Sequence, residues 1–443
     1  MNYYIFSFGC QMNVSDSLWL DRSLQAMGLK PCTREEEADI FLINTCSVRE
    51  KPEQKIYSLL GRLHEYTREN PHVFAGVGGC VAQQVGKGFL ERFSFVRLVF
   101  GTDGLVMVPE AIKRLIKDRH LKTSLLDFQD HYPERQEYWP EEVPAQAFVN
   151  IMQGCNNFCA YCIVPYTRGR QKSRSSAEVL RECAGLVSRG CREITLLGQN
   201  VNSYGQDKNG SEMPFSELLR RVAGLPGLER LRFTTSHPKD IDQEVIRAFG
   251  ELPALCPHLH LPLQSGSDQV LSSMGRKYTR EDYLRIVDEL RSTCPDISLT
   301  TDLIVGFPGE TDTDFEKTME MVNRVGFDSS FSFKYSDRPG VRAANMQPKI
   351  KEEVKTERLA LLQELQSGLT RDRLARRVGR REQVLVEGRS KKQGPPDTIS
   401  WTGRDPGGRL VHVPLPGERD CTGELLSVAI VRAHKHSLSG EVI

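Results

Sequence analysis

The stretch Gly154-Cys155-Asn156-Asn157-Phe158-Cys159-Ala160-Tyr161-Cys162 decides the fold and chemistry of the middle of the chain. Its C-x3-C-x2-C spacing puts three thiolates on one short loop, where they can bind three corners of a [4Fe–4S] cube and leave the fourth iron open. A zinc site and three unrelated core cysteines are the alternatives. Zinc prefers four ligands, commonly including a His, and no His lies near this loop, so the spacing favours a cluster.

An iron without a protein ligand can chelate the amino and carboxylate groups of S-adenosylmethionine (SAM). Electron transfer into the sulfonium then cleaves a C–S bond and releases a 5′-deoxyadenosyl radical. The cofactor supplies this chemistry, while the protein supplies geometry and excludes water. The loop therefore predicts a radical SAM enzyme.

A series of strand-like and helix-like segments surrounds this loop, and short Gly-rich or polar motifs follow the strands. Six such units predict a partial (β/α)6 barrel, in which function lies at the carboxyl ends of the strands. We place this domain at residues 146–378, including a long charged helix at 351–378. The expected strands are Ala147–Met152, Glu193–Leu197, Arg230–Thr234, His258–Leu261, Ser298–Val305 and Ser329–Lys334.

The first part of the chain, residues 1–127, also alternates strands with helices, which predicts an α/β domain with a parallel sheet. Its expected strands are Tyr3–Phe8, Asp39–Ile43, Val73–Val77 and Val96–Phe100. Cys10, Cys46 and Cys80 each close or follow one of these strands, so their loops share one sheet edge. They could form a second three-thiolate site, or they could be three buried structural thiols.

Two further segments complete the chain. Residues 128–145 are rich in Pro and charge and read as a linker. Residues 379–443 contain short β-like runs broken by Gly and Pro, which predicts a small antiparallel barrel. From residue 371 onward there are 14 Lys and Arg against 9 Asp and Glu, although the whole chain is nearly neutral with 59 against 58. The basic excess is therefore confined to the carboxyl-terminal end.

The overall composition indicates the class of protein and its compartment. Hydrophobic residues make up 39% and charged residues 26% of the 443 residues, as in ordinary globular proteins. No apolar run approaches the roughly 18 residues of a membrane span, and the amino terminus lacks the features of a signal peptide. We therefore expect a cytoplasmic protein without membrane contact, whose twelve cysteines are reduced.

Taken together, the C-x3-C-x2-C loop, the three early cysteines and the basic β-rich tail resemble the radical SAM methylthiotransferases over essentially the whole chain. The resemblance implies two [4Fe–4S] clusters, a radical SAM cluster on Cys155, Cys159 and Cys162 and an auxiliary cluster on Cys10, Cys46 and Cys80. It also implies that the tail is a TRAM domain, which binds RNA.

Several motifs resemble the MiaB branch of this family: Gly9-Cys10-Gln11-Met12-Asn13, Asn44-Thr45-Cys46-Ser47-Val48-Arg49, Pro165-Tyr166-Thr167-Arg168-Gly169-Arg170 and Leu197-Gly198-Gln199-Asn200. That branch adds a methylthio group to C2 of N6-isopentenyl(dimethylallyl)adenosine at tRNA position 37. It uses two SAM molecules and sulfur carried on the auxiliary cluster. The RimO branch, which modifies a ribosomal-protein aspartate, tends to have Cys-Pro-Lys-Asn after the first glycine, and the MtaB branch tends to have Cys-Lys-Val-Asn.

The resemblance also implies partners and cofactor contacts. The partners are the anticodon stem-loop of tRNA, an electron donor such as flavodoxin or ferredoxin, and a sulfur source for the auxiliary cluster; we expect a monomer. No catalytic residue is expected beyond the cluster ligands. Expected SAM contacts come from the cluster loop and the strand ends, and several of these positions could instead be ordinary packing or tight turns: Tyr161, Gly198, Gln199, Asn200, Gln264, Ser265, Gly306 and Phe307.

Basic side chains in two places are expected to bind tRNA phosphate. One group follows the cluster loop, and the other lies in the tail, although a solvated loop and a solvated helix face are the alternatives. The expected RNA contacts are Arg168, Arg170, Arg376, Arg377, Arg380, Arg381, Lys391 and Lys392.

Three positions depart from the branch's usual sequence, namely Ala160 in place of Thr, Gly275 in place of Asn and Val341 in place of Thr. None is a cluster ligand, so the expected activity is unaffected. Besides the ribosomal-protein branch, a non-enzymatic iron–sulfur protein that binds RNA or transfers electrons remains an alternative. That alternative needs no open iron.

Overall fold

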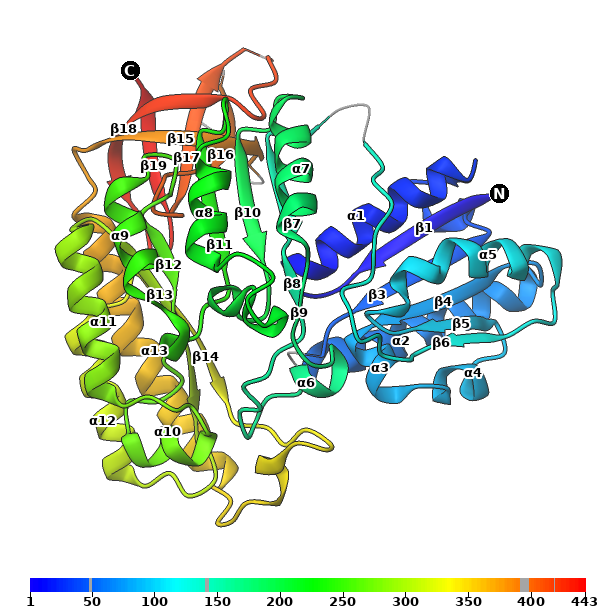
Figure 1. Cartoon of the computed structure of the whole chain (residues 1–443), viewed down its shortest axis with the longest axis horizontal. Helices are drawn as coiled ribbons and strands as arrows, with labels where there is room; N and C mark the ends of the chain where they lie inside the picture. Colours follow the sequence, from blue (N-terminus) through cyan, green and yellow to red (C-terminus); the bar gives the residue numbers. More distant parts are fainter. Residues whose placement is uncertain (48–49, 140–142, 391–397, 418) are drawn as a thin grey trace.

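The computed structural model describes residues 1–47, 50–139, 143–390, 398–417 and 419–443 (Figure 1). It places an α/β domain beside a central region of parallel strands and helices, with a small β-barrel at the carboxyl terminus. This is the fold class that the sequence predicts. None of the described helices is both long and apolar enough to cross a membrane.

The amino-terminal domain is a parallel sheet of six strands, ordered β2-β1-β3-β4-β5-β6. All six residues of the central strand β3 are buried, as expected for a parallel strand covered on both faces. The four predicted strands are confirmed with small shifts in their bounds, and the edge strands β2 and β6 were too short to predict. The strands are β1 (Asn2–Ser7), β2 (Lys30–Pro31), β3 (Ile40–Thr45), β4 (Phe74–Gly79), β5 (Val96–Phe100) and β6 (Thr123–Leu125).

Helices cover both faces of this sheet. Leu20 and Ile112 belong to the apolar core on one face, and Ile56 and Phe89 belong to the core on the other. The first face is covered by α1 (Gln11–Ala26) and α5 (Val108–Lys117), and the second by α2 (Glu50–Glu69), α3 (Cys80–Val85) and α4 (Gly88–Arg92).

The segment after β6 contains no helix or strand at its described residues 126–139 and 143–145. It nevertheless packs on the amino-terminal domain. The indole of Trp19 in α1 donates to the carbonyl of Gln136 at 3.0 Å, and Arg135 forms an ion pair with Asp16 at 2.7 Å. The predicted linker is thus a strap held against α1.

The central region has the six predicted barrel strands, arranged as two three-stranded parallel sheets. The sheets adjoin where a bridge joins Leu231 to Leu255. The strands are β7 (Gln146–Asn150), β10 (Glu193–Leu197), β11 (Arg230–Thr234), β12 (His258–His260), β13 (Ser298–Val305) and β14 (Ser329–Lys334), and the short strands β8 (Met152–Gln153) and β9 (Lys172–Ser173) pair beside the cluster loop.

Helices pack around these strands on one extended apolar core. Several begin at polar caps that satisfy their first backbone N–H groups, with full capping boxes at Thr279 and Thr311. The helices are α6 (Val164–Thr167), α7 (Ser176–Val187), α8 (Phe215–Ala223), α9 (Gln243–Glu251), α10 (Asp268–Met274), α11 (Arg280–Thr293) and α12 (Asp312–Val325). Short 3-10 turns lie at Glu35–Glu37, Gly104–Met107, Val201–Ser203, Gln206–Lys208, Pro238–Asp240 and Arg342–Asn345.

Helix α13 (Glu352–Ala375) leads into a closed five-stranded barrel, ordered β15-β16-β17-β19-β18. The β-like runs at residues 383–386, 410–413 and 425–431 predict three of these strands, whereas β16 and β19 were not predicted. The strands are β15 (Arg381–Arg389), β16 (Thr398–Arg404), β17 (Leu410–Pro416), β18 (Leu425–Ala433) and β19 (Leu438–Val442).

Two buried arginines of β11 fix this barrel to the central region. Arg230 donates to the carbonyls of Arg404 and Gln383, and Arg232 donates to those of Asp405 and Pro406. Both arginines lie in the first half of β11, so the small barrel sits at the amino ends of the central strands (Figure 1). The cluster loop lies at the opposite, carboxyl ends of the central strands.

Candidate functional site

The cluster loop follows β8 and is tied down by backbone contacts. Gly154 has φ +78°, and a Cβ there would lie 2.1 Å from the carbonyl oxygen of Arg170. The Gly154 amide donates to the side-chain oxygen of Gln199 at 2.6 Å, and the Cys155 amide donates to Gly169 at 3.2 Å. Only glycine therefore allows the sharp turn that opens the loop.

The three thiols of this loop influence one another electrostatically. Burial, followed by the neighbouring Cys159, raises the pKa of Cys162 to about 12. Burial also raises the pKa of Cys155. Beside them lies Arg276, which is 4% exposed and donates to the Cys159 sulfur at 3.6 Å. A buried cation next to three thiols suits a group that holds them as thiolates.

Arg276 is a residue that sequence reasoning did not assign. It lies 114 positions after Cys162 and reaches the loop only through the fold. Its other terminal nitrogen donates to the carbonyl of Pro262 at 2.9 Å, and its Nε donates to the Tyr278 hydroxyl at 3.2 Å. Its place in the Arg276-Lys277-Tyr278-Thr279 motif was the only signal for it.

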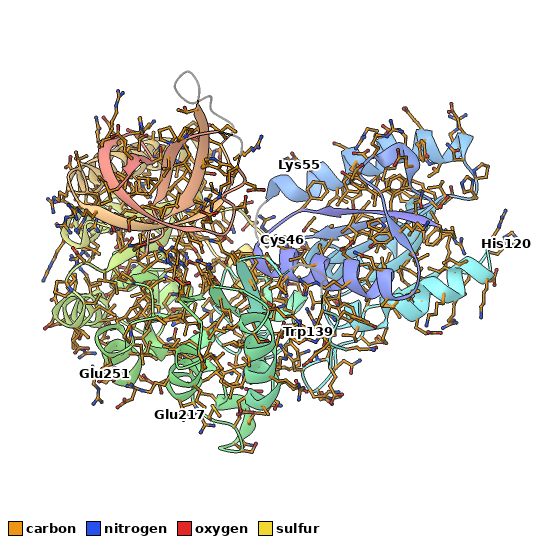
Figure 2. The ribbon with its side chains drawn as sticks, turned by 90° about the horizontal axis from the view of Figure 1, so that it is seen from above. Cys46, Lys55, His120, Trp139, Glu217 and Glu251 are labelled. Atoms are coloured by element: carbon orange, nitrogen blue, oxygen red, sulfur yellow. The ribbon has the colours of Figure 1, made fainter. Side chains whose placement is uncertain are left out.

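The second set of cysteines lies at one edge of the amino-terminal sheet. Cys10 caps α1 after β1, Cys46 follows β3, and Cys80 begins α3 after β4. These three strands are neighbours and run parallel, so the three loops meet. Figure 2 shows Cys46 where the amino-terminal domain meets the central region.

Cys10 and Cys46 are in direct contact. A Cβ built on Gly9 would lie 2.4 Å from the Cβ of Cys46, and the Cys10 thiol donates to the side-chain oxygen of Asn13 at 3.2 Å. A hydrogen bond from Cys46 lowers the pKa of Cys10 to about 5 against the opposing effect of burial, and the positive charge of Arg168 adds to the lowering. Cys10 is therefore prepared to be a thiolate.

Arg168 follows the cluster loop in the sequence, but its side chain lies at the second set of cysteines. It comes six residues after Cys162, yet it is 3% exposed and lies among Cys10, Cys46 and Cys80. The short helix before it, α6, packs against α3, which begins at Cys80. Such burial leaves Arg168 no surface on which to meet tRNA, which corrects the expectation from the basic run.

The two cysteine sets differ from the site of a single metal ion. Among the described residues, no group of three or more His, Cys, Asp or Glu side chains is arranged to hold a single metal ion. A [4Fe–4S] cube is a larger body whose three thiolate ligands bind three different irons, so its ligands need not meet at one point. Two all-thiol sets, each with a buried arginine, fit such clusters and do not fit a single ion.

The predicted SAM contacts lie around the cluster loop. Besides holding Gly154, Gln199 donates to the sulfur of Met12 in α1, so it touches both domains. Tyr161 lies 3.5 Å from Arg276. Gly198 leaves no room for a Cβ, which would lie 2.5 Å from Met152. These residues flank the loop on its β10 side.

The remaining predicted contacts belong to the turns after the fourth and fifth barrel strands. Gln264 has φ +70° and bridges to β13, and Ser265 is fully buried against Thr318. Gly306 has φ +71°, and its amide donates to Glu310 at 2.6 Å. Phe307 is buried in a small apolar cluster that includes Ala160, so it forms part of the wall behind the cluster loop.

Sequence reasoning also missed a group of buried polar atoms at the carboxyl ends of β10 and β11. Within the described part of the chain, these atoms have no hydrogen-bond partner: the side-chain oxygen of Asn200, both side-chain polar atoms of Asn202, the Ser236 hydroxyl and Nε2 of His237. Burial, and then the charge of Arg276, lowers the pKa of His237 to about 2, so its ring is neutral. The Thr235-Ser236-His237-Pro238 motif is their sequence signal.

The other predicted RNA contacts differ in exposure. Arg170 is exposed, with its guanidinium 5.5 Å from the Phe158 ring. Arg376 and Arg381 are exposed near the end of α13, whereas Arg377 pairs with Glu382 and Asp296, and Arg380 pairs with Asp296. Lys391 and Lys392 lie outside the described residues. The structure does not bring these groups together, because α13 ends near the amino ends of the barrel strands, opposite the cluster loop (Figure 1).

Two of the three departures fit their surroundings. Gly275 ends α10 with φ +73°, a conformation open to Gly and also to Asn, so the exchange keeps the turn. Ala160 is buried and pairs through its backbone with Met274 and Ala343. Val341 is buried, and nothing in the structure explains the loss of a hydroxyl there.

A cavity of about 290 Å³ lies away from both cysteine sets. It is bounded by α1, the strap and β7, with Trp19, Tyr138 and Trp139 among its walls and Arg135 at its edge. None of the predicted site residues lines it. It is therefore a feature of the domain junction and not of the cluster sites.

Known proteins match both halves of this arrangement. Residues 149–322 match the family described as "Radical SAM superfamily", and residues 2–101 match "Uncharacterized protein family UPF0004". A tRNA-2-methylthio-N(6)-dimethylallyladenosine synthase of Nitratidesulfovibrio vulgaris strain Hildenborough is 58% identical over 440 residues, covering 99% of this chain and 98% of its own. The protein of that name from Oleidesulfovibrio alaskensis is 56% identical over 454 residues, covering 99% and 98%.

Solved structures share the fold at low identity. The radical SAM methyltransferase TsrM from Kitasatospora setae, solved with cobalamin and a [4Fe–4S] cluster, has a TM-score of 0.57 at 15% identity, covering 77% of this chain and 76% of its own. The cobalamin-dependent radical SAM enzyme OxsB has a TM-score of 0.51 at 12% identity, covering 83% and 56%. These likenesses concern the arrangement of the domains alone.

Proposed function

The chain belongs to the family of tRNA-2-methylthio-N(6)-dimethylallyladenosine synthases, which are radical SAM enzymes, and we propose that it adds a methylthio group to C2 of N6-dimethylallyladenosine at position 37 of tRNA. Membership of the radical SAM superfamily implies SAM and a [4Fe–4S] cluster. The observation that carries the proposal is that two three-cysteine sets lie on either side of one domain junction, where Gln199 contacts both Gly154 and Met12.

Each set has its own role in this proposal. Cys155, Cys159 and Cys162 would hold the cluster that binds SAM, and Cys10, Cys46 and Cys80 would hold an auxiliary cluster that carries the transferred sulfur. The bound groups would supply a 5′-deoxyadenosyl radical and the sulfur, which together can functionalise an aromatic C–H bond without a leaving group. Two SAM molecules would be used per product, one as methyl donor and one as radical source.

The chain's own residues would hold these groups and keep water out. Gln199 accepts a hydrogen bond from the Gly154 amide at the first turn of the cluster loop, and it also contacts Met12 of the amino-terminal domain. These two contacts would hold the two domains in a fixed relative position. Phe307 and Ala160 belong to an apolar wall beside the loop. Neutral His237 and the unpartnered Asn202 side chain offer polar atoms for SAM or the adenine. A radical needs such a dry and rigid site.

The tRNA would be held by exposed arginines, with Arg170 near the cluster loop and Arg376 and Arg381 near the small barrel. The target adenosine lies in the single-stranded anticodon loop, where unstacking is cheaper than flipping from a duplex. A low-potential electron donor such as flavodoxin or ferredoxin, and a sulfur source, would complete the reaction.

The test uses the full chain, reconstituted anaerobically with iron and sulfide. With SAM, a reductant and tRNA that carries N6-dimethylallyladenosine, nucleoside mass spectrometry should detect the 2-methylthio product. The variant C155A/C159A/C162A should lose SAM cleavage to 5′-deoxyadenosine. The variant C10A/C46A/C80A should keep that cleavage and lose the product.

Two results would overturn the proposal. One is unmodified tRNA after incubation with a chain that carries about eight irons, the content of two [4Fe–4S] clusters. The other is full product formation by C10A/C46A/C80A, which would show that the second set of cysteines has no part in the reaction.

A further inference from the structure

The terminal nitrogens of Arg168 are buried without a hydrogen-bond partner among the residues that the structure describes. Its side chain is 3% exposed, and among the described residues neither Nη1 nor Nη2 finds an acceptor. The nearest carboxylate is that of Asp16, whose oxygen is 3.8 Å from Nη2, too long for a hydrogen bond. A guanidinium with its terminal nitrogens unsatisfied is among the least favourable groups to bury.

Asp16 does not account for the burial of Arg168, because Asp16 already forms an ion pair with another arginine. Arg135 donates to Asp16 at 2.7 Å, and the Asn150 amide donates to the same oxygen at 3.5 Å. Arg168 approaches only the second oxygen, from a distance. The position of Arg168 is therefore set by something other than an ion pair with Asp16.

Three thiols lie close to Arg168, in addition to the carboxylate of Asp16. The groups that act most strongly on the buried guanidinium are the thiol of Cys80, the carboxylate of Asp16 and the thiols of Cys10 and Cys46. Each thiolate is expected to bind an iron of the auxiliary cluster. Arg168 thus lies beside the three thiols that would hold the auxiliary cluster, and neither of its terminal nitrogens has another acceptor among the described residues.

We propose that Arg168 is a positioning residue of the auxiliary site, whose Nη1 and Nη2 donate hydrogen bonds to an anionic sulfur ligand, a sulfide or an alkanethiolate, held on the open iron. This inference rests on the proposed function, which places a sulfur-carrying cluster on Cys10, Cys46 and Cys80. Hydrogen bonds from a cation to an anion are short and strong, and two from one planar guanidinium also fix direction. Arg168 would therefore both retain the sulfur and orient it.

The test isolates the auxiliary cluster. In the full chain carrying C155A/C159A/C162A, Arg168→Gln and Arg168→Lys are compared with Arg135→Gln, a matched control that removes the arginine paired with Asp16. Sodium sulfide and methanethiol are titrated into each reduced, reconstituted protein, and binding is followed by the electron paramagnetic resonance spectrum of the cluster. The two titrants show whether the site prefers sulfide or thiolate.

We expect R168Q to weaken binding of at least one titrant by about tenfold or more, the effect of losing a charge-assisted hydrogen bond. R168K should recover part of this loss, and R135Q should bind like the parent. Equal affinities in R168Q and the parent would overturn the proposal. A parent that binds fewer than about four irons would instead overturn the auxiliary cluster itself, and the role of Arg168 with it.

Thermal unfolding of the iron-free proteins separates this role from a structural one. Without the cluster, Arg168 is a buried charge whose terminal nitrogens have no hydrogen-bond acceptor among the described residues, so R168Q should not lower the melting temperature. R135Q should lower it, because that change breaks a buried ion pair. A fall in R168Q as large as that in R135Q would mean that Arg168 is a structural residue, and the proposal would fail.

Discussion

Replacing Gly9 by Ala should empty the auxiliary site and leave the radical SAM site loaded. Gly9 has φ +146°, and its new Cβ would lie 2.4 Å from the Cβ of Cys46 and 2.7 Å from the side-chain oxygen of Asn13. Both atoms are far inside normal contact distance, and Asn13 in turn holds the carbonyl of Thr45 at 2.9 Å, just before Cys46. The backbone strain alone is about 1–3 kcal/mol. Overpacking adds about 1–3 kcal/mol more, and displacing Cys46 is the readiest way to relieve it.

The assay is iron content after anaerobic reconstitution. We expect iron to fall from about eight to about four atoms per chain in G9A, with SAM cleavage to 5′-deoxyadenosine retained and the methylthio product lost. Gly28→Ala is the matched control, because Gly28 also has a positive φ, +84°, but its Cβ meets nothing within 4 Å. That change should cost only about 1–2 kcal/mol and keep all the iron.

The reciprocal variant is Gly154→Ala, whose Cβ would lie 2.1 Å from a backbone oxygen. It should lose the other half of the iron, and SAM cleavage with it. The reasoning would be refuted if G9A kept about eight irons per chain. It would also be refuted if G9A and G154A lost the same spectroscopic signal.

Three further predictions concern thiol reactivity, domain packing and RNA binding. In the iron-free protein at pH 6, iodoacetamide should modify Cys10 far faster than Cys162. The reason is that a pKa of about 5 leaves Cys10 a thiolate, whereas a pKa of about 12 leaves Cys162 protonated. Peptide mass spectrometry measures both rates, and the rate at Cys10 should fall below pH 5. Lys172→Met should lower the free energy of unfolding by about 3–5 kcal/mol in denaturant unfolding. The substitution leaves the buried carboxylate of Asp103 at the domain junction without its paired cation. Replacing both partners by apolar residues should cost less. Arg381→Ala should weaken tRNA binding similarly for all tRNAs and reduce the slope of log affinity against log salt by about one.

Each of these has a clear contrary result. Equal alkylation of the two cysteines at pH 6 would contradict the electrostatics of the auxiliary site. A loss below about 1 kcal/mol in K172M would mean that this buried pair contributes little, as surface pairs do. An unchanged salt slope in R381A would remove that residue from the RNA surface.

The fold was predictable where local patterns repeat. The six barrel strands and the four central strands of the first domain were placed within one or two residues for the most part, because buried parallel strands are nearly continuous apolar runs. Among the strands that escaped prediction, β2 and β6 are short and lie at sheet edges, and β16 and β19 of the closed barrel lack a continuous apolar run. The strap has no sequence pattern at its described residues 126–139, and only its contacts with Trp19 and Asp16 of α1 reveal its place.

The candidate site was predictable only in its ligands. C-x3-C-x2-C is a local spacing, so the sequence alone identifies the first cluster loop. Cys10, Cys46 and Cys80 lie 36 and 34 residues apart, and their contact depends on the order of strands in the parallel sheet. The resemblance to a known family supplied what spacing could not.

The sequence by itself determined one three-thiol loop, one α/β domain, a partial barrel and a basic β-rich tail. Those features are local, since they depend on spacing, periodicity and charge within short windows. Only the tertiary structure decided what surrounds the thiols. Arg168 reads as part of an exposed basic run and is buried between the cysteine sites, and Arg276 reaches Cys159 from more than a hundred residues away. The physical reason is that burial and charge compensation arise from packing between elements distant in sequence, which no local pattern records.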